Sequence, residues 1–243
     1  MTVRRVVVAI AGGDRTFRVV REAVRVASCL DAALEGRFLE DEDLLRLAAY
    51  SFAQRTDSAG GTRALRAEDL EREWRAVAAD VRSTLEREAA HQRVEARFAV
   101  ERGRPRDAVS RQIEQGDVVV VGWGGWSPKA ARSAPVRVLF DGSDAAERAL
   151  EAGARLAGDD GRLSVWVVGG DDAAVEATRE RLSGRVARLR VAPIADATPP
   201  TVQHILAAHP GGLLLVPSTS GLAEALASGA DDARFPAGVL VVH

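Results

Sequence analysis

The chain has 243 residues, 47% of them hydrophobic, which suits a globular protein of one large or two small domains. Its 33 basic and 35 acidic residues leave a net charge of −2, without blocks of like charge, so nucleic acid and anionic membranes are disfavoured as partners. No apolar run approaches the length of about 18 residues that a membrane span needs. The single cysteine, Cys29, permits neither an internal disulfide nor a multi-cysteine metal site, and we expect a buried thiol in a cytoplasmic protein.

The first part of the chain alternates strand and helix patterns. A β-branched run at 6–11 ends in small residues and predicts a strand, and a second strand is expected at 34–39. Two segments carry apolar residues at spacings of three and four, which predicts helices packed on a sheet. These residues are Phe17, Val20, Val24, Ala27 and Leu30 in one segment, and Leu70, Trp74, Val77, Val81 and Leu85 in the other.

An insertion with an acidic start is expected at 41–67, beginning where the second strand ends. It includes a predicted short helix and a stretch rich in serine and glycine. Such an excursion suits a lid, a partner-docking arm or a cap over the apolar sheet.

The second part of the chain repeats the landmarks of the first in the same order. The matching pairs are the strand runs 6–11 and 136–140, the strand runs 34–39 and 163–168, the helix-opening prolines Pro105 and Pro200, and the fully apolar runs 118–121 and 213–216. Fully apolar runs are typical of central strands in a parallel sheet that helices cover on both faces. We therefore infer an imperfect duplication, with one domain at 1–134 and a second at 135–243.

The first copy is shorter at its end than the second. Between Gly122 and Val136 the chain has too little room for a fourth helix and a fifth strand. The apolar edge that this leaves needs a neighbouring strand. Residues 239–242 of the second copy would give an intramolecular pseudo-dimer, and a second chain would give a homodimer.

Motifs of known enzymes are missing from the sequence. The only lysine, Lys129, lies outside any phosphate-binding P-loop pattern, and the four histidines do not have the spacing of zinc ligands. Ser218 and Ser220 are not part of a nucleophile elbow. The sequence thus indicates neither a hydrolase nor a metal site.

Three segments carry a family resemblance. They are a strand followed by Asp141-Gly142-Ser143 and a helix, the turn Gly103-Arg104-Pro105 before a helix and the strand 118–122, and the closing strand at 235–242. Together they resemble a universal stress protein, and with the repeat the chain resembles a tandem pair over nearly its full length. The resemblance implies an α/β fold with two doubly wound parallel sheets of strand order 3-2-1-4-5, the first without its last helix and strand. It also implies dimers.

The resemblance also implies a position for a nucleotide. Members that bind ATP use the aspartate after strand one, backbone groups of strand two, and a glycine loop after strand four that holds the phosphates. In this sequence the corresponding residues are Asp141, Gly142, Ser143, Val168, Ser218, Thr219, Ser220 and Gly229 in the second copy, with Gly122 and Gly125 in the first.

Both copies depart from the ATP-binding pattern. The second copy has Pro217, Ser220 and Ala230 where the loop needs glycines, and the first has Ala11 and Pro135 in place of the aspartate and a glycine. Side chains then occupy the space of the phosphates, and a proline lacks the amide that would bind them. Ser143 also has a purely structural interpretation, as the N-cap of the following helix.

We therefore expect a non-enzymatic regulatory or accessory protein linked to stress, which acts through an unidentified protein partner at 41–67. No cofactor is expected. The alternative is an ATP-binding universal stress protein that uses Mg²⁺ and catalyses slow ATP hydrolysis or phosphotransfer. A third hypothesis is a sensor of an unrelated small molecule at the degenerate site.

Overall fold

The computed structural model describes residues 3–10, 12, 16–50, 52–56, 60–115, 117–123, 135–159, 161–208, 210–228, 235 and 237–243. The first half of the chain contains β1 (Arg5–Ile10), α1 (Thr16–Leu30), β2 (Ala33–Asp41), α2 (Glu42–Ala48), β3 (Gln54–Thr56), β4 (Thr62–Ala64), α3 (Ala67–Gln92), β5 (Ala96–Gly103), α4 (Pro105–Gln115) and β6 (Val118–Trp123). The second half contains β7 (Val136–Phe140), α5 (Asp144–Ala157), β8 (Arg162–Val168), α6 (Asp172–Leu182), β9 (Arg188–Ile194), α7 (Pro199–Ala208), β10 (Leu213–Pro217), α8 (Gly221–Ser228) and β11 (Gly238–Val242).

Nine strands form one sheet in the order β5-β2-β1-β6-β11-β10-β7-β8-β9. The first half contributes β5-β2-β1-β6, which has the predicted order 3-2-1-4, and the second half contributes β9-β8-β7-β10-β11, which has the order 3-2-1-4-5. The predicted α/β fold class is confirmed. The strands nevertheless form one continuous sheet in place of the two separate sheets that we expected.

The two halves meet where β6 pairs with β11. All other neighbouring strands of this sheet are parallel, but β6 and β11 are antiparallel, with Val119 opposite Val241. Both valines are only 1% exposed. The physical cause is the apolar edge of β6, which would be exposed to water without a neighbour. In the described part of the chain, the closing strand of the second half, which includes residues 239–242, covers this edge. This is the pairing that the pseudo-dimer alternative required.

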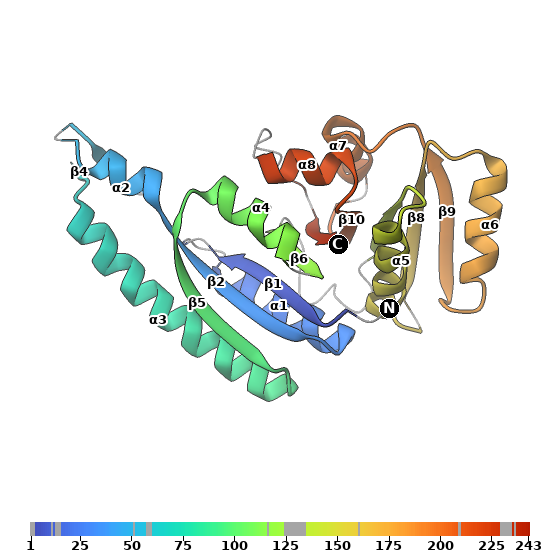
Figure 1. The fold of residues 1–243 in the computed structure, drawn as a ribbon, viewed down its shortest axis with the longest axis horizontal. Helices are drawn as coiled ribbons and strands as arrows, with labels where there is room; N and C mark the ends of the chain where they lie inside the picture. The colour runs from blue at the N-terminus through green and yellow to red at the C-terminus, as the bar shows by residue number, and fades with distance from the viewer. Residues whose placement is uncertain are drawn as a thin grey trace.

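Helices cover both faces of the sheet (Figure 1). Residues of α1, α3, α5 and α6 share one hydrophobic core, and residues of α4, α7 and α8 belong to the other. Helix pairs also connect the halves: α1 contacts α5, and α4 contacts α8, where the Ser110 hydroxyl donates a hydrogen bond of 3.2 Å to the Ala227 carbonyl. Among the described residues, no helix is long and apolar enough to cross a bilayer.

The helix faces predicted from periodicity are largely the buried ones. In α1, Val20, Val24, Ala27 and Leu30 are fully buried, and in α3 the buried residues include Leu70, Trp74, Val81 and Leu85. Two expectations for α1 are wrong. Phe17 is 39% exposed because it lies in the first turn, and Cys29 is exposed because it lies on the solvent side of the last turn.

The segment after β2 forms an arm at one end of the molecule, made of α2 and the β3–β4 hairpin (Figure 1). Asp41 begins it as the N-cap of α2, where its carboxylate accepts hydrogen bonds from the amides of Asp43 and Leu44. Arg55 in β3 forms an ion pair of 2.5 Å with Glu73 of α3. This ion pair ties the arm to the long helix α3. The predicted short helix is confirmed as α2, whereas the β3–β4 hairpin was not predicted.

Candidate functional site

A cavity of about 360 Å³ lies at the carboxyl ends of the second-half strands. Its lining is contributed by the ends of β7, β8 and β10, by the segment after β9, and by the start of α8: Leu139, Asp141, Val168, Ala195, Asp196, Ala197, Thr198, Pro199, Pro217, Thr219, Ser220 and Gly221. β7 lies between β8 and β10 in the sheet, so the connections that lead to these two strands run to opposite sides of β7. The cavity therefore lies at the switch point of the strand order, where ligands of doubly wound sheets bind.

Asp141 and Ser143 are placed by the turn between β7 and α5. β7 is buried along its whole length, and Gly142 follows Asp141 with a φ of 79°, a left-handed conformation that favours glycine. The Asp141 carboxylate accepts a hydrogen bond of 3.0 Å from the Ser143 amide. The Ser143 hydroxyl in turn accepts a hydrogen bond of 3.1 Å from the Ala146 amide, so the predicted N-cap is confirmed.

The loop after β10 uses most of its polar groups within the protein. The Ser218 amide donates to the Val242 carbonyl at 2.7 Å, and the Ser218 hydroxyl lies 3.1 Å from Nδ1 of His243. The Ser220 amide and hydroxyl both donate to the Pro217 carbonyl, at 3.0 and 2.8 Å. The same Ser220 hydroxyl accepts from an amide of α8, as an N-cap does.

Thr219 links the two loops across the mouth of the cavity. Its hydroxyl oxygen lies 2.9 Å from the Ser143 hydroxyl and donates a longer hydrogen bond of 3.4 Å to the Asp141 carboxylate. The turn after β7 and the turn after β10 are thereby joined by side chains that are 76 and 78 residues apart in sequence. This contact fixes the side of the cavity that carries the aspartate.

Asp196 adds a second carboxylate to the lining of the cavity, and it was not predicted from the sequence. Asp196 accepts hydrogen bonds from the amide and the hydroxyl of Thr198, at 3.0 and 2.7 Å. The hydrogen bonds from the hydroxyls of Thr198 and then Thr201 hold the pKa of Asp196 below its ordinary value. The signal in the sequence was an Asp-x-Thr turn directly before the helix-opening Pro199.

The structure brings together only part of the predicted nucleotide site. Asp141, Val168, Thr219 and Ser220 line the cavity, and Ser143 contacts it through Thr219. Gly142 and Ser218 do not line the cavity, although each is next in the chain to a residue that does. Gly125 and Gly229 lie outside the described residues. Among the residues that are described, no group of three His, Cys, Asp or Glu side chains could hold a metal ion.

Gly122 lies far from this cavity because the two halves run in opposite directions. It pairs with Val239 near the start of β11, whereas the cavity lies beyond the end of the parallel strand β10. The carboxyl ends of the first-half strands are therefore at the opposite edge of the sheet. A composite site that combines Gly122 with Asp141 is excluded by this geometry.

A comparison with solved structures identifies the fold. The chain superimposes on a universal stress protein from Archaeoglobus fulgidus DSM 4304 with a TM-score of 0.62 and 13% identity, covering 97% of this chain and 95% of that one. The protein has a universal stress protein fold. Two proteins from Pseudomonas aeruginosa are also similar to it: a putative universal stress protein from strain UCBPP-PA14 (TM-score 0.45, 14% identity, 99% and 93% coverage) and a functionally unknown protein from strain PAO1 (0.46, 12%, 99% and 92%). No protein-family model and no curated protein sequence matches the chain.

Proposed function

We propose that this protein is a non-enzymatic regulatory or accessory protein of the universal stress type. It acts in the cytoplasm by associating with a protein partner, and its affinity for nucleotides is weak or lost. The observation that carries the proposal is the loop after β10, where Pro217 lacks an amide hydrogen and the amides of Ser218 and Ser220 already donate hydrogen bonds within the chain.

Phosphate binding at a strand-to-helix loop depends on backbone amides that point into open space. In this loop Pro217 has no amide hydrogen, the Ser218 amide is taken by Val242, and the Ser220 amide is taken by Pro217. At the start of α8, the Ala223 amide is taken by the Ser220 hydroxyl. A triphosphate would have to break these hydrogen bonds before it gained its own, which supports weak binding.

A second candidate function is ATP binding with slow hydrolysis or phosphotransfer. It is favoured by one observation: Asp141, Val168 and Gly221 line the same cavity, at the place where the resemblance puts the adenosine and the start of a helix. A helix amino end favours an anion, and an aspartate can accept hydrogen bonds from a ribose.

Calorimetric titration of the purified chain with ATP and Mg²⁺ separates the two functions. Our proposal expects no tight, saturable heat that depends on Asp141. Tight, saturable heat that Asp141→Ala abolishes, and that Asp80→Ala on the exposed side of α3 leaves unchanged, would establish the second function in its place. The Asp80 variant is a matched control because it removes the same charge far from the cavity.

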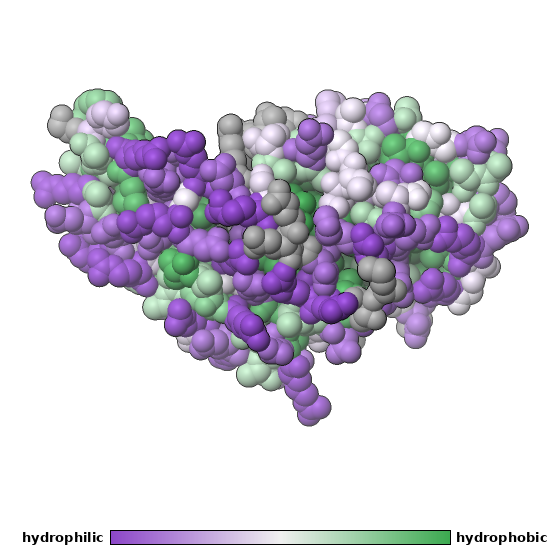
Figure 2. All heavy atoms as spheres, viewed as in Figure 1, coloured by the Kyte–Doolittle hydropathy of each residue, from purple (hydrophilic) through white to green (hydrophobic). Residues whose placement is uncertain are grey.

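The arm supplies the surface for the proposed protein partner. Three of its large hydrophobic residues are exposed: Leu47 by 44%, Tyr50 by 57% and Phe52 by 74%. The rings of Tyr50 and Phe52 stack with their centroids 5.3 Å apart. In Figure 2 hydrophobic residues lie at this end of the molecule, next to a largely hydrophilic surface over α3. Exposed aromatic residues of this kind are enriched at protein interfaces.

Site-specific photocrosslinking in cells tests the role of the arm. A photoreactive phenylalanine at position 47 should give a discrete adduct with one protein, and the same group at Glu176, exposed on α6, should not. The adduct should disappear when Tyr50 and Phe52 are both replaced by serine. Equal adducts from both positions, or an adduct that survives the double replacement, would contradict the proposal.

We also infer that the two halves descend from one duplicated unit, with domains at 1–134 and 135–243. The supporting observation is that β5-β2-β1-β6 and β9-β8-β7-β10 have the same order and that the halves meet in an antiparallel strand pair.

Because β11 covers the edge of β6, the pseudo-dimer within one chain is the form we propose. Light scattering of the eluting protein should give the mass of a single chain, whereas the mass of two would favour the homodimer.

A further inference from the structure

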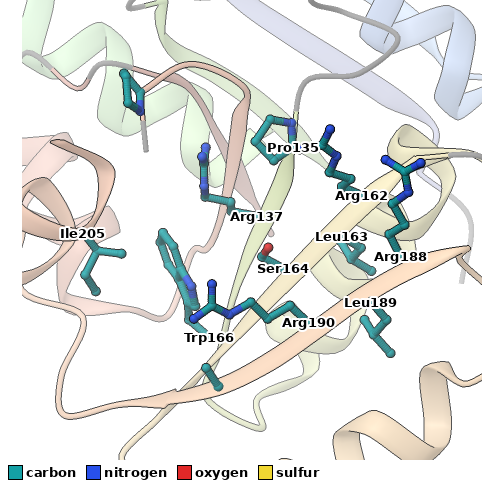
Figure 3. A pocket seen from close by; sticks show the side chains of 12 residues that line it. Pro135, Arg137, Arg162, Leu163, Ser164, Trp166, Arg188, Leu189, Arg190 and Ile205 are labelled. Carbon is teal, nitrogen blue, oxygen red and sulfur yellow. The ribbon is translucent and has the colours of Figure 1, made fainter. Parts of the chain in front are cut away.

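A second and larger cavity lies at the amino ends of the second-half strands (Figure 3). Its volume is about 580 Å³, within the range of roughly 300–1,000 Å³ that is typical of small-molecule sites. It is formed between the start of the strands β7, β8 and β9 and the end of α7, to which Ile205 belongs. The site described above lies on the carboxyl side of the same strands, so the two cavities have different walls and no residue in common.

Four arginines line this cavity: Arg137, Arg162, Arg188 and Arg190. Each of the strands β7, β8 and β9 contributes at least one of them, and successive side chains of a strand point to opposite faces, so Arg188 and Arg190 share a face. Neighbouring strands are in register, with Arg162 opposite Arg188. We call this cavity the arginine groove.

The arginine groove contains no acidic residue in its described lining. Among the described residues, Arg162, Arg188 and Arg190 have no carboxylate within ion-pair distance. The equivalent edge strands of the first half are different. There Arg37 pairs with Glu35 and Glu101, at 2.9 and 2.8 Å. The excess of positive charge is therefore specific to the second half.

Arg137 forms the base of the arginine groove. It is only 3% exposed, and its Nη1 donates a hydrogen bond of 2.6 Å to the Gly211 carbonyl. Burial lowers the pKa of its guanidinium from the ordinary value, since a charged group is disfavoured away from water.

The rest of the wall is largely apolar and includes a flat aromatic ring. Trp166 is 7% exposed, it pairs with Ala192 of the next strand, and Ile205 lines the same cavity. Figure 3 shows the Arg190 side chain extending toward the indole of Trp166, with Arg162 and Arg188 beside each other at the other end of the groove. Guanidinium groups both pair with carboxylates or phosphates and stack on flat rings. The apolar wall thus favours a ligand with a ring, and the arginines favour one with negative charge.

We propose that the arginine groove binds a small aromatic anion, with the ring beside Trp166 and Arg190 and a phosphate or carboxylate at Arg162 and Arg188. A bare inorganic anion would leave the apolar wall unused, and a neutral ring would leave the charges unused. Binding in the arginine groove does not depend on whether the cavity at the carboxyl ends of the strands accepts ATP, because the two cavities share no residue.

The test is calorimetric titration with 1-naphthyl phosphate as the probe. Inorganic phosphate and 1-naphthol serve as the charge without the ring and the ring without the charge. We expect saturable binding of 1-naphthyl phosphate and binding at least about tenfold weaker for each of the other two, since 1-naphthol lacks the charge that the arginines bind and inorganic phosphate lacks the ring that packs on the apolar wall. If 1-naphthol bound as tightly as 1-naphthyl phosphate, the groove would bind only the ring, and the proposal would be wrong. Failure of 1-naphthyl phosphate to bind would also overturn it.

Two triple variants separate the groove from general charge attraction. Arg162→Gln, Arg188→Gln and Arg190→Gln together should weaken binding of 1-naphthyl phosphate at least about tenfold. The control replaces three exposed arginines of α3 in the same way, Arg72→Gln, Arg75→Gln and Arg87→Gln, and should bind as the original chain does. Equal weakening in both variants would show that net charge attracts the probe and would refute the site. Circular dichroism of both variants confirms that the comparison is between folded proteins.

Discussion

Glu22 is a carboxyl group buried on α1, and its replacement should make the protein more stable at neutral pH. Its residue exposure is 1%, and it forms an ion pair of 3.3 Å with Arg25. Burial raises its pKa from 4.5 to about 6, although Arg25, Arg18 and Arg21 act in the opposite direction. The desolvation of the carboxylate thus outweighs three neighbouring cations.

The raised pKa fixes the sign of the pH dependence. Between about pH 4.5 and 6 the folded chain holds the Glu22 proton more tightly than the unfolded chain, so this group lowers the stability as the pH rises. Above that window the ionised form costs about 2 kcal/mol, from about 1.4 kcal/mol for each pH unit. A glutamine keeps the shape of the side chain and never ionises.

We expect Glu22→Gln to equal the original chain near pH 4 and to exceed its free energy of unfolding by up to about 2 kcal/mol at pH 7.5. Urea unfolding at a series of pH values measures this difference. Glu86→Gln, exposed on α3, is the control and should show no such trend. A difference that stays constant from pH 4 to 7.5, or a less stable Glu22 variant at pH 7.5, would refute the reasoning.

Three further substitutions test the packing, the capping and the junction of the sheet. Gly153→Val should lower the free energy of unfolding by about 1–3 kcal/mol, because a Cβ at Gly153 would lie 2.5 Å from Cγ2 of Val138; an unchanged melting temperature would contradict this close packing. Ser143→Ala should cost about 1 kcal/mol in urea unfolding through the lost N-cap, and no cost would show that the cap is dispensable. Val241→Asp places an unpaired carboxylate in the β6–β11 pair and should prevent cooperative unfolding followed by circular dichroism, whereas a normal transition would argue against this strand pairing.

The central strands and the turn after β7 could be predicted because their sequence signals are local. A strand buried on both faces needs an unbroken apolar run, and 118–121 and 213–216 are such runs, found here in β6 and β10. Likewise, Ser143 directly before a helical run predicts an N-cap, and its hydroxyl accepts the Ala146 amide. In both cases the residues that decide the structure lie within one element.

The arginine groove and the second carboxylate of the cavity could not be predicted in this way. Three different strands carry arginines near their beginnings, and only the register of the sheet brings these side chains to one cavity. They are Arg137, Arg162 and Arg188. Asp196 was missed because Asp-x-Thr before a proline is common in turns that bind nothing. Arginines at 188 and 190 are a local signal in the sequence, since two residues apart in a strand they share one face.

The direction of the strands at the junction decides how the degenerate motifs are to be interpreted. Each half retains a residue of the nucleotide-binding pattern that the other has lost, Gly122 in the first half and Asp141 in the second. The antiparallel pairing of β6 with β11 turns the carboxyl ends of the two halves to opposite edges of one sheet. Gly122 of the first half therefore cannot replace the amide lost at Pro217. Among the described residues, the site at the carboxyl ends of the second-half strands has to work with the residues of its own half.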